Sequence, residues 1–105
     1  MLKIVKGNVL RSKGGIMMLY GKLKEYRAVI TFPSLTEALG AEKVLIRFDC
    51  PFASIPTPRS LRSGCNTSLC FPLERKEIVD EVIDDGVVLT GAYEAREDGF
   101  FSLVW

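Results

Sequence analysis

The last third of the chain reads Pro72-Leu-Glu-Arg-Lys-Glu-Ile-Val-Asp-Glu-Val-Ile-Asp-Asp-Gly86, then Val87-Val-Leu-Thr-Gly-Ala-Tyr93, and after a short turn Phe100-Phe-Ser-Leu-Val-Trp105. Apolar residues recur at helical spacing in the first of these segments, and acidic residues occupy the opposite face. Pro72 suits the first turn of a helix and Gly86 suits its end. The two apolar runs that follow, joined through a turn sequence, predict a β-hairpin. This stretch therefore predicts a helix of about three turns over residues 73–84, followed by two antiparallel strands.

Working back along the chain, the residues between 27 and 71 give weaker signals. Arg27-Ala-Val-Ile-Thr-Phe32 is rich in β-branched and aromatic residues, which predicts a strand. Ser34 with Glu37 forms a capping box, so we expect a short helix over residues 35–39 that Gly40 ends. Residues 43–48 predict a strand. Residues 49–71 carry three prolines and a polar string, and they predict a connection much longer than usual, which is typical of a functional loop.

The first twenty residues predict more strand. An apolar alternation over residues 2–10 indicates a half-buried strand with a turn or bulge at Gly7-Asn8, and Ser12-Lys-Gly-Gly15 is a turn signal before a second apolar run over 16–20. Strands come in runs and do not alternate strictly with helices. The sequence therefore predicts an α+β fold with a mainly antiparallel sheet of about six strands, two helices packed on one face, and a single domain over residues 1–105.

Composition bounds the class of protein. The chain has 105 residues, 48% hydrophobic and 26% charged, as in an ordinary globular protein. No apolar run is long enough to cross a bilayer, and charges interrupt the start where a signal peptide needs its apolar region. We therefore expect a cytoplasmic protein with no membrane partner.

Histidine is absent from the sequence. This excludes histidine-dependent triads and dyads, histidine bases and histidine metal ligands. The three cysteines, Cys50, Cys65 and Cys70, lack the close pairs of structural zinc sites, and their odd number argues against a disulfide framework. We expect thiols with structural or incidental roles in preference to a metal or redox role, no bound metal and no cofactor.

The long connection holds the candidate site. Arg59 and Arg62 lie three residues apart, with Ser60 and Ser63 beside them. Arginine matches the geometry of phosphate or carboxylate in bidentate fashion, and serine-rich backbone can hold an anion. These four residues are therefore the candidate anion- or ligand-binding residues. The competing interpretation is an exposed loop whose arginines remain in water.

Charge is unevenly distributed along the chain. Residues 1–29 contain seven basic residues and one acidic residue, and residues 30–105 contain seven basic and twelve acidic residues. The basic part, with Tyr20 and Tyr26 interleaved, could line a groove for bases, and the opposed charges could meet between subunits. The acidic residues of the last helix could suggest a metal or carboxylate site, but they are typical of a solvated helix face.

Three classes of function remain open. The favoured one is a small non-enzymatic binding or interaction module that forms a homodimer and binds a protein or a small anionic ligand, because histidine is missing and the apolar last strand could pair with a second copy. The second is a nucleic-acid-binding accessory protein that uses the basic N-terminal third and Arg59 with Arg62. The third is a histidine-free enzyme, for instance a nuclease. Catalytic residues cannot be assigned from the sequence.

Overall fold

The computed structural model describes residues 21–61 and 64–103. The predicted strands and turns over residues 2–20 lie outside this part. In chain order the elements are η1 (Gly21–Lys24), β1 (Ala28–Thr31), α2 (Leu35–Arg47), β2 (Ala53–Pro56), β3 (Thr67–Phe71), η2 (Leu73–Arg75), α3 (Ile78–Asp84), β4 (Gly91–Arg96) and β5 (Gly99–Ser102). The α+β prediction is confirmed, with five strands in the described part where about six were expected.

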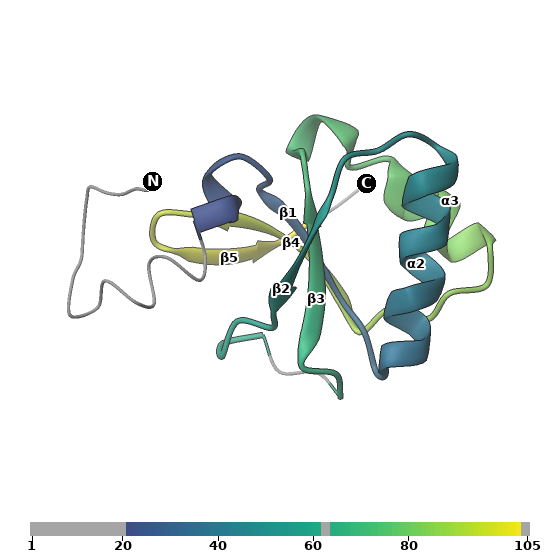
Figure 1. Ribbon diagram of the computed structural model, residues 1–105. Coiled ribbons are helices and arrows are strands. Elements are labelled where there is room, and N and C mark those ends of the chain that lie inside the picture. The colour runs from purple at the N-terminus through teal and green to yellow at the C-terminus, as the bar shows by residue number, and fades with distance from the viewer. Residues whose placement is uncertain (1–20, 62–63, 104–105) are drawn as a thin grey trace.

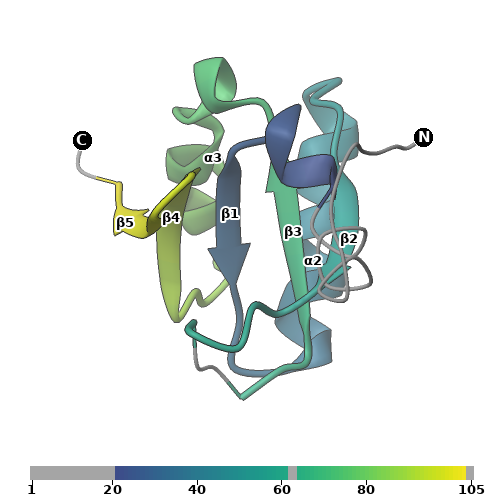
Figure 2. The same ribbon diagram turned by 90° about the vertical axis from the view of Figure 1, so that its left-hand side faces the viewer.

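The strands form one antiparallel sheet in the order β2-β3-β1-β4-β5. β1 is central, and it pairs with β3 on one side and with β4 on the other (Figure 2). The edges of the sheet in the described part are β2 and β5. β5 is the second strand of the predicted C-terminal hairpin, which is confirmed with its turn just before Gly99, whose φ of 147° suits glycine.

The two faces of the sheet build two apolar clusters, because successive side chains of a strand point to opposite faces. On β1, Ile30 belongs to the cluster under the helices, and Val29 belongs to the cluster on the other face. α2 and α3 both cover the first face (Figure 1). On the second face, Leu23 of η1 and Leu61 of the β2–β3 connection belong to the same cluster as Val29. The helices lie on one face, as expected.

The helix lengths differ from those predicted. The strand expected over 43–48 is wrong: α2 continues through these residues and has thirteen residues in place of about five. Its buried residues, Ala38, Ala41, Val44 and Leu45, follow the helical period, so burial against the sheet outweighs the β propensity of the apolar run. Gly40 does not end the helix. A Cβ there would lie 3.3 Å from Cγ2 of Val87, so the missing side chain lets the segment after α3 approach.

The last helix and the long loop also need correction. Residues 73–84 form a 3-10 turn, η2, and then the seven-residue α3, so the single three-turn helix predicted here is wrong. The longer helix is α2 and the shorter one is α3, the reverse of the prediction. The region 49–71 is not one loop, because it contains β2 and β3. The sequence did not predict β2 because Pro56 and the exposed Ser54 do not suit a central strand. An edge strand such as β2 tolerates both residues. The true connection is residues 57–66.

Candidate functional site

Three thiols are the most reactive side chains that the described residues offer. Cys70 lies inside β3, fully buried, and burial raises the pKa of its thiol to about 11. Cys50 follows α2 and is 3% exposed, and burial raises its pKa as well, opposed by the charge of Arg75. A raised pKa keeps both thiols protonated at neutral pH, and the protonated thiol is a poor nucleophile.

Cys65 lies in a different setting, on the connection between β2 and β3. It is buried, 8% exposed, and belongs to the apolar cluster under the helices, whereas its neighbours Gly64 and Asn66 are exposed. The start of α2 and the residues that precede β3 lie at the same end of the sheet (Figure 1). Cys65 is therefore a largely buried thiol on a connection at one end of the sheet.

Two backbone contacts fix the connection against the start of α2. The amide of Cys65 donates a hydrogen bond of 3.2 Å to the carbonyl oxygen of Phe32, the residue after β1. Gly64 packs so closely against the carbonyl of Pro33 that a Cβ at this position would overlap with it. Glycine is required here by close approach of two backbones, and this approach sets the position of Cys65.

On its other side the connection is held by Thr57. The Thr57 hydroxyl donates a 3.0 Å hydrogen bond to the carbonyl oxygen of Cys65, and it pairs at 2.7 Å with the hydroxyl of the fully buried Ser68. The amide of Thr57 donates to the carbonyl of Asn66 at 2.8 Å, which extends the β2–β3 ladder by one step. Residues 65–68 are thus tied to residue 57 through both backbone and side chain.

The sulfur of Cys65 also accepts a hydrogen bond. The amide of Thr67 lies 3.4 Å from Cys65 Sγ and donates to it. This hydrogen bond orients the sulfur, which is the reactive atom of a cysteine side chain. The connection therefore holds a cysteine sulfur in a defined orientation.

The predicted anion-binding residues are on the same connection, and the structure describes two of the four. Arg59 and Ser60 are exposed in a turn, and Arg62 and Ser63 lie outside the described residues. The turn is anchored at both ends: Pro58 and Leu61 are buried, and the amide of Leu61 donates to the carbonyl of Pro58 at 2.9 Å. Sequence reasoning missed Cys65, although a cysteine after a glycine in a proline-rich connection was a signal for it.

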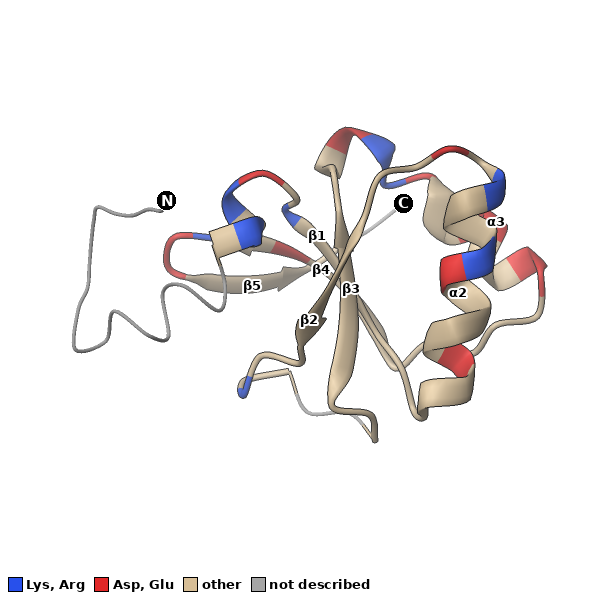
Figure 3. Cartoon of the chain, viewed as in Figure 1, with Lys and Arg blue, Asp and Glu red and all other residues tan. Residues whose placement is uncertain are grey.

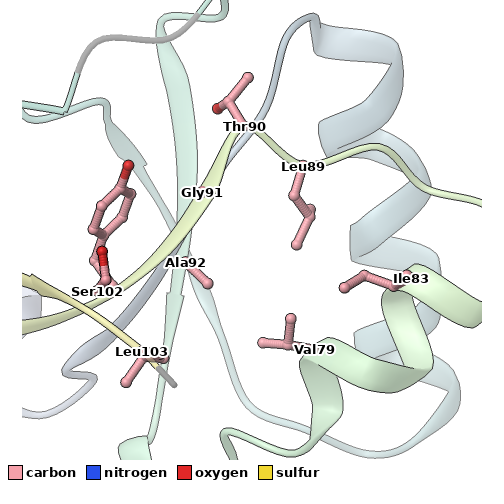
Figure 4. Close-up of a pocket in the computed structure, with 9 residues that line it drawn as sticks. Val79, Ile83, Leu89, Thr90, Gly91, Ala92, Ser102 and Leu103 are labelled. Atoms are coloured by element: carbon pink, nitrogen blue, oxygen red, sulfur yellow. The ribbon is translucent and has the colours of Figure 1, made fainter. Parts of the chain in front are cut away.

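A shallow groove of about 390 Å³ lies elsewhere, between α3 and the β4–β5 hairpin. Val79 and Ile83 of α3 point toward Leu89 and Ala92 across it (Figure 4). Its polar groups are the hydroxyls of Thr90, Tyr93 and Ser102, and no charged residue lines it within the described part of the chain. The groove offers apolar contact but no reactive group.

In the described ranges, no group of three or more Cys, Asp or Glu side chains is placed to hold a metal ion. Basic residues gather on η1 and the segment after it, and acidic residues lie on α3 (Figure 3). On β4, Glu94 accepts hydrogen bonds from Arg27 at 2.6 Å and from Arg96 at 3.3 Å.

Among residues 21–61 and 64–103, no helix has the length and apolar character needed to span a membrane.

Comparison with known proteins matches the chain to a family. A family model described as "Putative Se/S carrier protein-like" matches residues 27–94, which is more than half of the chain and includes β1, both α helices, all three cysteines and most of β4. No curated protein and no solved structure matches the chain. The matched segment begins at Arg27 and ends at Glu94, the two residues joined by the 2.6 Å ion pair. The chain belongs to the Se/S carrier protein-like family.

Proposed function

We propose that this protein carries sulfur or selenium, bound covalently to the thiol of Cys65. The family description supports the class of cargo. A covalent carrier of these elements needs a side chain that forms S–S or S–Se bonds, and cysteine is the side chain suited to this chemistry. The proposal is more specific than the prediction from sequence, which was a small non-enzymatic binding or interaction module, because it names the cargo and the residue that binds it.

The observation that carries the proposal is the contrast among the three thiols. Cys65 is also buried, at 8% exposed, but it lies on the connection between β2 and β3, and the N–H of Thr67 donates to its sulfur. Cys70 is enclosed within the sheet, and burial holds its pKa near 11. Cys50 is also buried, with its pKa raised. Cys65 is therefore the thiol to which we assign the cargo.

The transfer step balances without an external oxidant or reductant. The Cys65 thiolate attacks the outer sulfur of a donor persulfide, R–S–SH, and a new S–S bond forms at Cys65. The donor S–S bond breaks, and R–S⁻ leaves with the bonding electrons and takes up a proton from water. The product is Cys65–S–SH. Attack on that outer sulfur by an acceptor thiolate reverses the step and delivers the cargo.

Loading by small donors tests the proposal. The protein is incubated with inorganic polysulfide for sulfur, or with selenodiglutathione for selenium, and its intact mass is measured by mass spectrometry. We expect the wild type to gain cargo and Cys65→Ser to gain none. Cys50→Ser and Cys70→Ser are matched controls, and we expect each to load like the wild type. Loading that survives Cys65→Ser, or failure of the wild type to load with either donor, would refute the proposed function.

A further inference from the structure

We propose that Thr57 is a positioning residue for the Cys65 thiol, acting through a relay of hydrogen bonds that aims the Thr67 amide at the sulfur. The inference rests on the proposed role of Cys65 as the carrier thiol. It starts from an unusual concentration of contacts: the amide of Thr57 binds the carbonyl of Asn66, and its hydroxyl binds both Cys65 and Ser68.

The direction of the relay follows from counting protons. A threonine hydroxyl has one proton to donate and can accept as well. The geometry assigns that proton to the Cys65 carbonyl, at 3.0 Å. The 2.7 Å contact between the hydroxyls of Thr57 and Ser68 is then donated by Ser68. Ser68 is fully buried, so the relay runs from the interior of the sheet through Thr57 to the backbone of Cys65. Successive hydrogen bonds of this kind polarise and strengthen one another.

The relay acts on the sulfur through the backbone between residues 65 and 67. Thr57 fixes the carbonyl of Cys65 with its hydroxyl and the carbonyl of Asn66 with its amide. These two carbonyls bracket Asn66, and fixing them sets the orientation of the next amide, that of Thr67. That amide is the donor to Cys65 Sγ at 3.4 Å. Thr57 therefore controls whether an N–H group faces the sulfur, although its own side chain does not contact the sulfur.

The same argument identifies what Thr57 does for reactivity. The hydrogen bond from Thr67 holds the Cys65 sulfur in one orientation. Loss of the Thr57 hydroxyl frees the carbonyl of Cys65, and the buried hydroxyl of Ser68 loses its acceptor. The connection then relaxes and the Thr67 amide turns away from the sulfur part of the time. The expected consequence is a slower reaction of the Cys65 sulfur with an alkylating reagent.

Site-resolved alkylation tests this. The protein is treated with iodoacetamide over a range of pH, then digested with trypsin, and labelling of Cys65 is read from the fragment spectrum of its peptide. We expect Thr57→Val to lower the rate of Cys65 labelling roughly threefold to tenfold, the range of one lost hydrogen bond. Thr57→Ser keeps the hydroxyl, and we expect it to restore the wild-type rate.

Thr90→Val is the matched control. Thr90 forms a similar hydroxyl pair with Thr31, at 2.6 Å on β1, and we expect its loss to lower stability but not to change the rate of Cys65 labelling. A Thr57→Val rate equal to that of the wild type would show that Thr57 is only structural and would overturn the proposal. If Thr57→Val does not fold, Ser68→Ala breaks the relay from its buried end, and an unchanged rate there overturns the proposal equally. The readout needs no sulfur transfer, so its outcome is separate from that of the loading experiment.

Discussion

The amide of Cys65 donates a 3.2 Å hydrogen bond to the carbonyl of Phe32, and this contact joins the β2–β3 connection to the end of β1. Phe32 is fully buried in the cluster under the helices. The backbone of the proposed carrier residue is therefore fixed to the core, while its neighbours Gly64 and Asn66 stay exposed. A reactive group held by a rigid element needs little reorganisation when a donor arrives.

Gly64→Ala tests how tightly this connection is packed. An added Cβ would overlap with the carbonyl of Pro33, so one of the two backbones must move. We expect a loss of about 1–3 kcal/mol in the free energy of unfolding, the usual cost of inserting atoms into a packed site. Gly21→Ala is the control, because a Cβ at Gly21 meets nothing within 4 Å. Denaturant titration of both variants measures the difference, and equal stabilities would contradict this packing.

Glu94 gives a prediction for the dependence of stability on pH. The hydrogen bond from Arg96, and then that from Arg27, lowers the pKa of Glu94 below its ordinary value of 4.5. A lowered pKa in the folded state means that the carboxylate stabilises the fold above 4.5 and that this contribution is lost as pH falls through the folded pKa. We expect Glu94→Gln to have a lower Tm than the wild type at neutral pH and the same Tm in strong acid. Glu97→Gln, in the exposed turn, is the control, and a Tm difference for Glu94→Gln that persists in acid would count against the account.

How much of this was accessible from sequence differs between elements. The C-terminal hairpin could be predicted because its apolar runs and turn are local signals, and the buried Ile78, Val79 and Val82 matched the predicted helix face. The second half of α2 could not be predicted. Its β-branched residues are a local signal for a strand, and Gly40 is a local signal for the end of a helix, but packing against the sheet overrides both signals.

The site depended on the same kind of non-local information. Cys65 meets Thr57 and Thr67 only because β2 and β3 pair in one register, with Pro56 opposite Thr67. The sequence predicted a single loop over residues 49–71, and a loop has no strand register that would bring these residues together. The sequence therefore indicated that the connection is functional and which anions it could attract, but not which thiol it positions.

The predicted role of Arg59 can be tested with reagents of different charge. Arg59 is exposed on the connection that carries Cys65, so its charge should attract an anionic reactant without contributing to the core. We expect Arg59→Ala to slow the reaction of Cys65 with the anionic reagent dithiobis(nitrobenzoate) roughly two- to fivefold at low salt, an effect that salt should screen. The rate with neutral iodoacetamide and the Tm should stay unchanged. Lys43→Ala, which removes an exposed charge on α2, is the control, and a large fall in Tm for Arg59→Ala would instead mark a structural residue.

Self-association remains a prediction, and β5 is the strand that could mediate it. β5 is an edge strand in the described part, and Phe101 on it is 37% exposed. Two copies of an edge strand can pair in antiparallel fashion about a two-fold axis. We expect light scattering at micromolar concentration to give about twice the chain mass. Phe101→Lys should reduce that mass toward the monomer, and a wild-type monomer over the whole range would exclude the homodimer.

Mapping the cargo to one sulfur atom tests the central claim most directly. After loading with polysulfide and blocking of persulfides by alkylation, trypsin releases residues 63–75, which contain both Cys65 and Cys70, and residues 48–59, which contain Cys50. Fragment spectra then separate the three positions. The account predicts the extra sulfur on Cys65, with Cys50 and Cys70 unmodified. Extra sulfur on Cys50 or Cys70, with Cys65 unmodified, would contradict it.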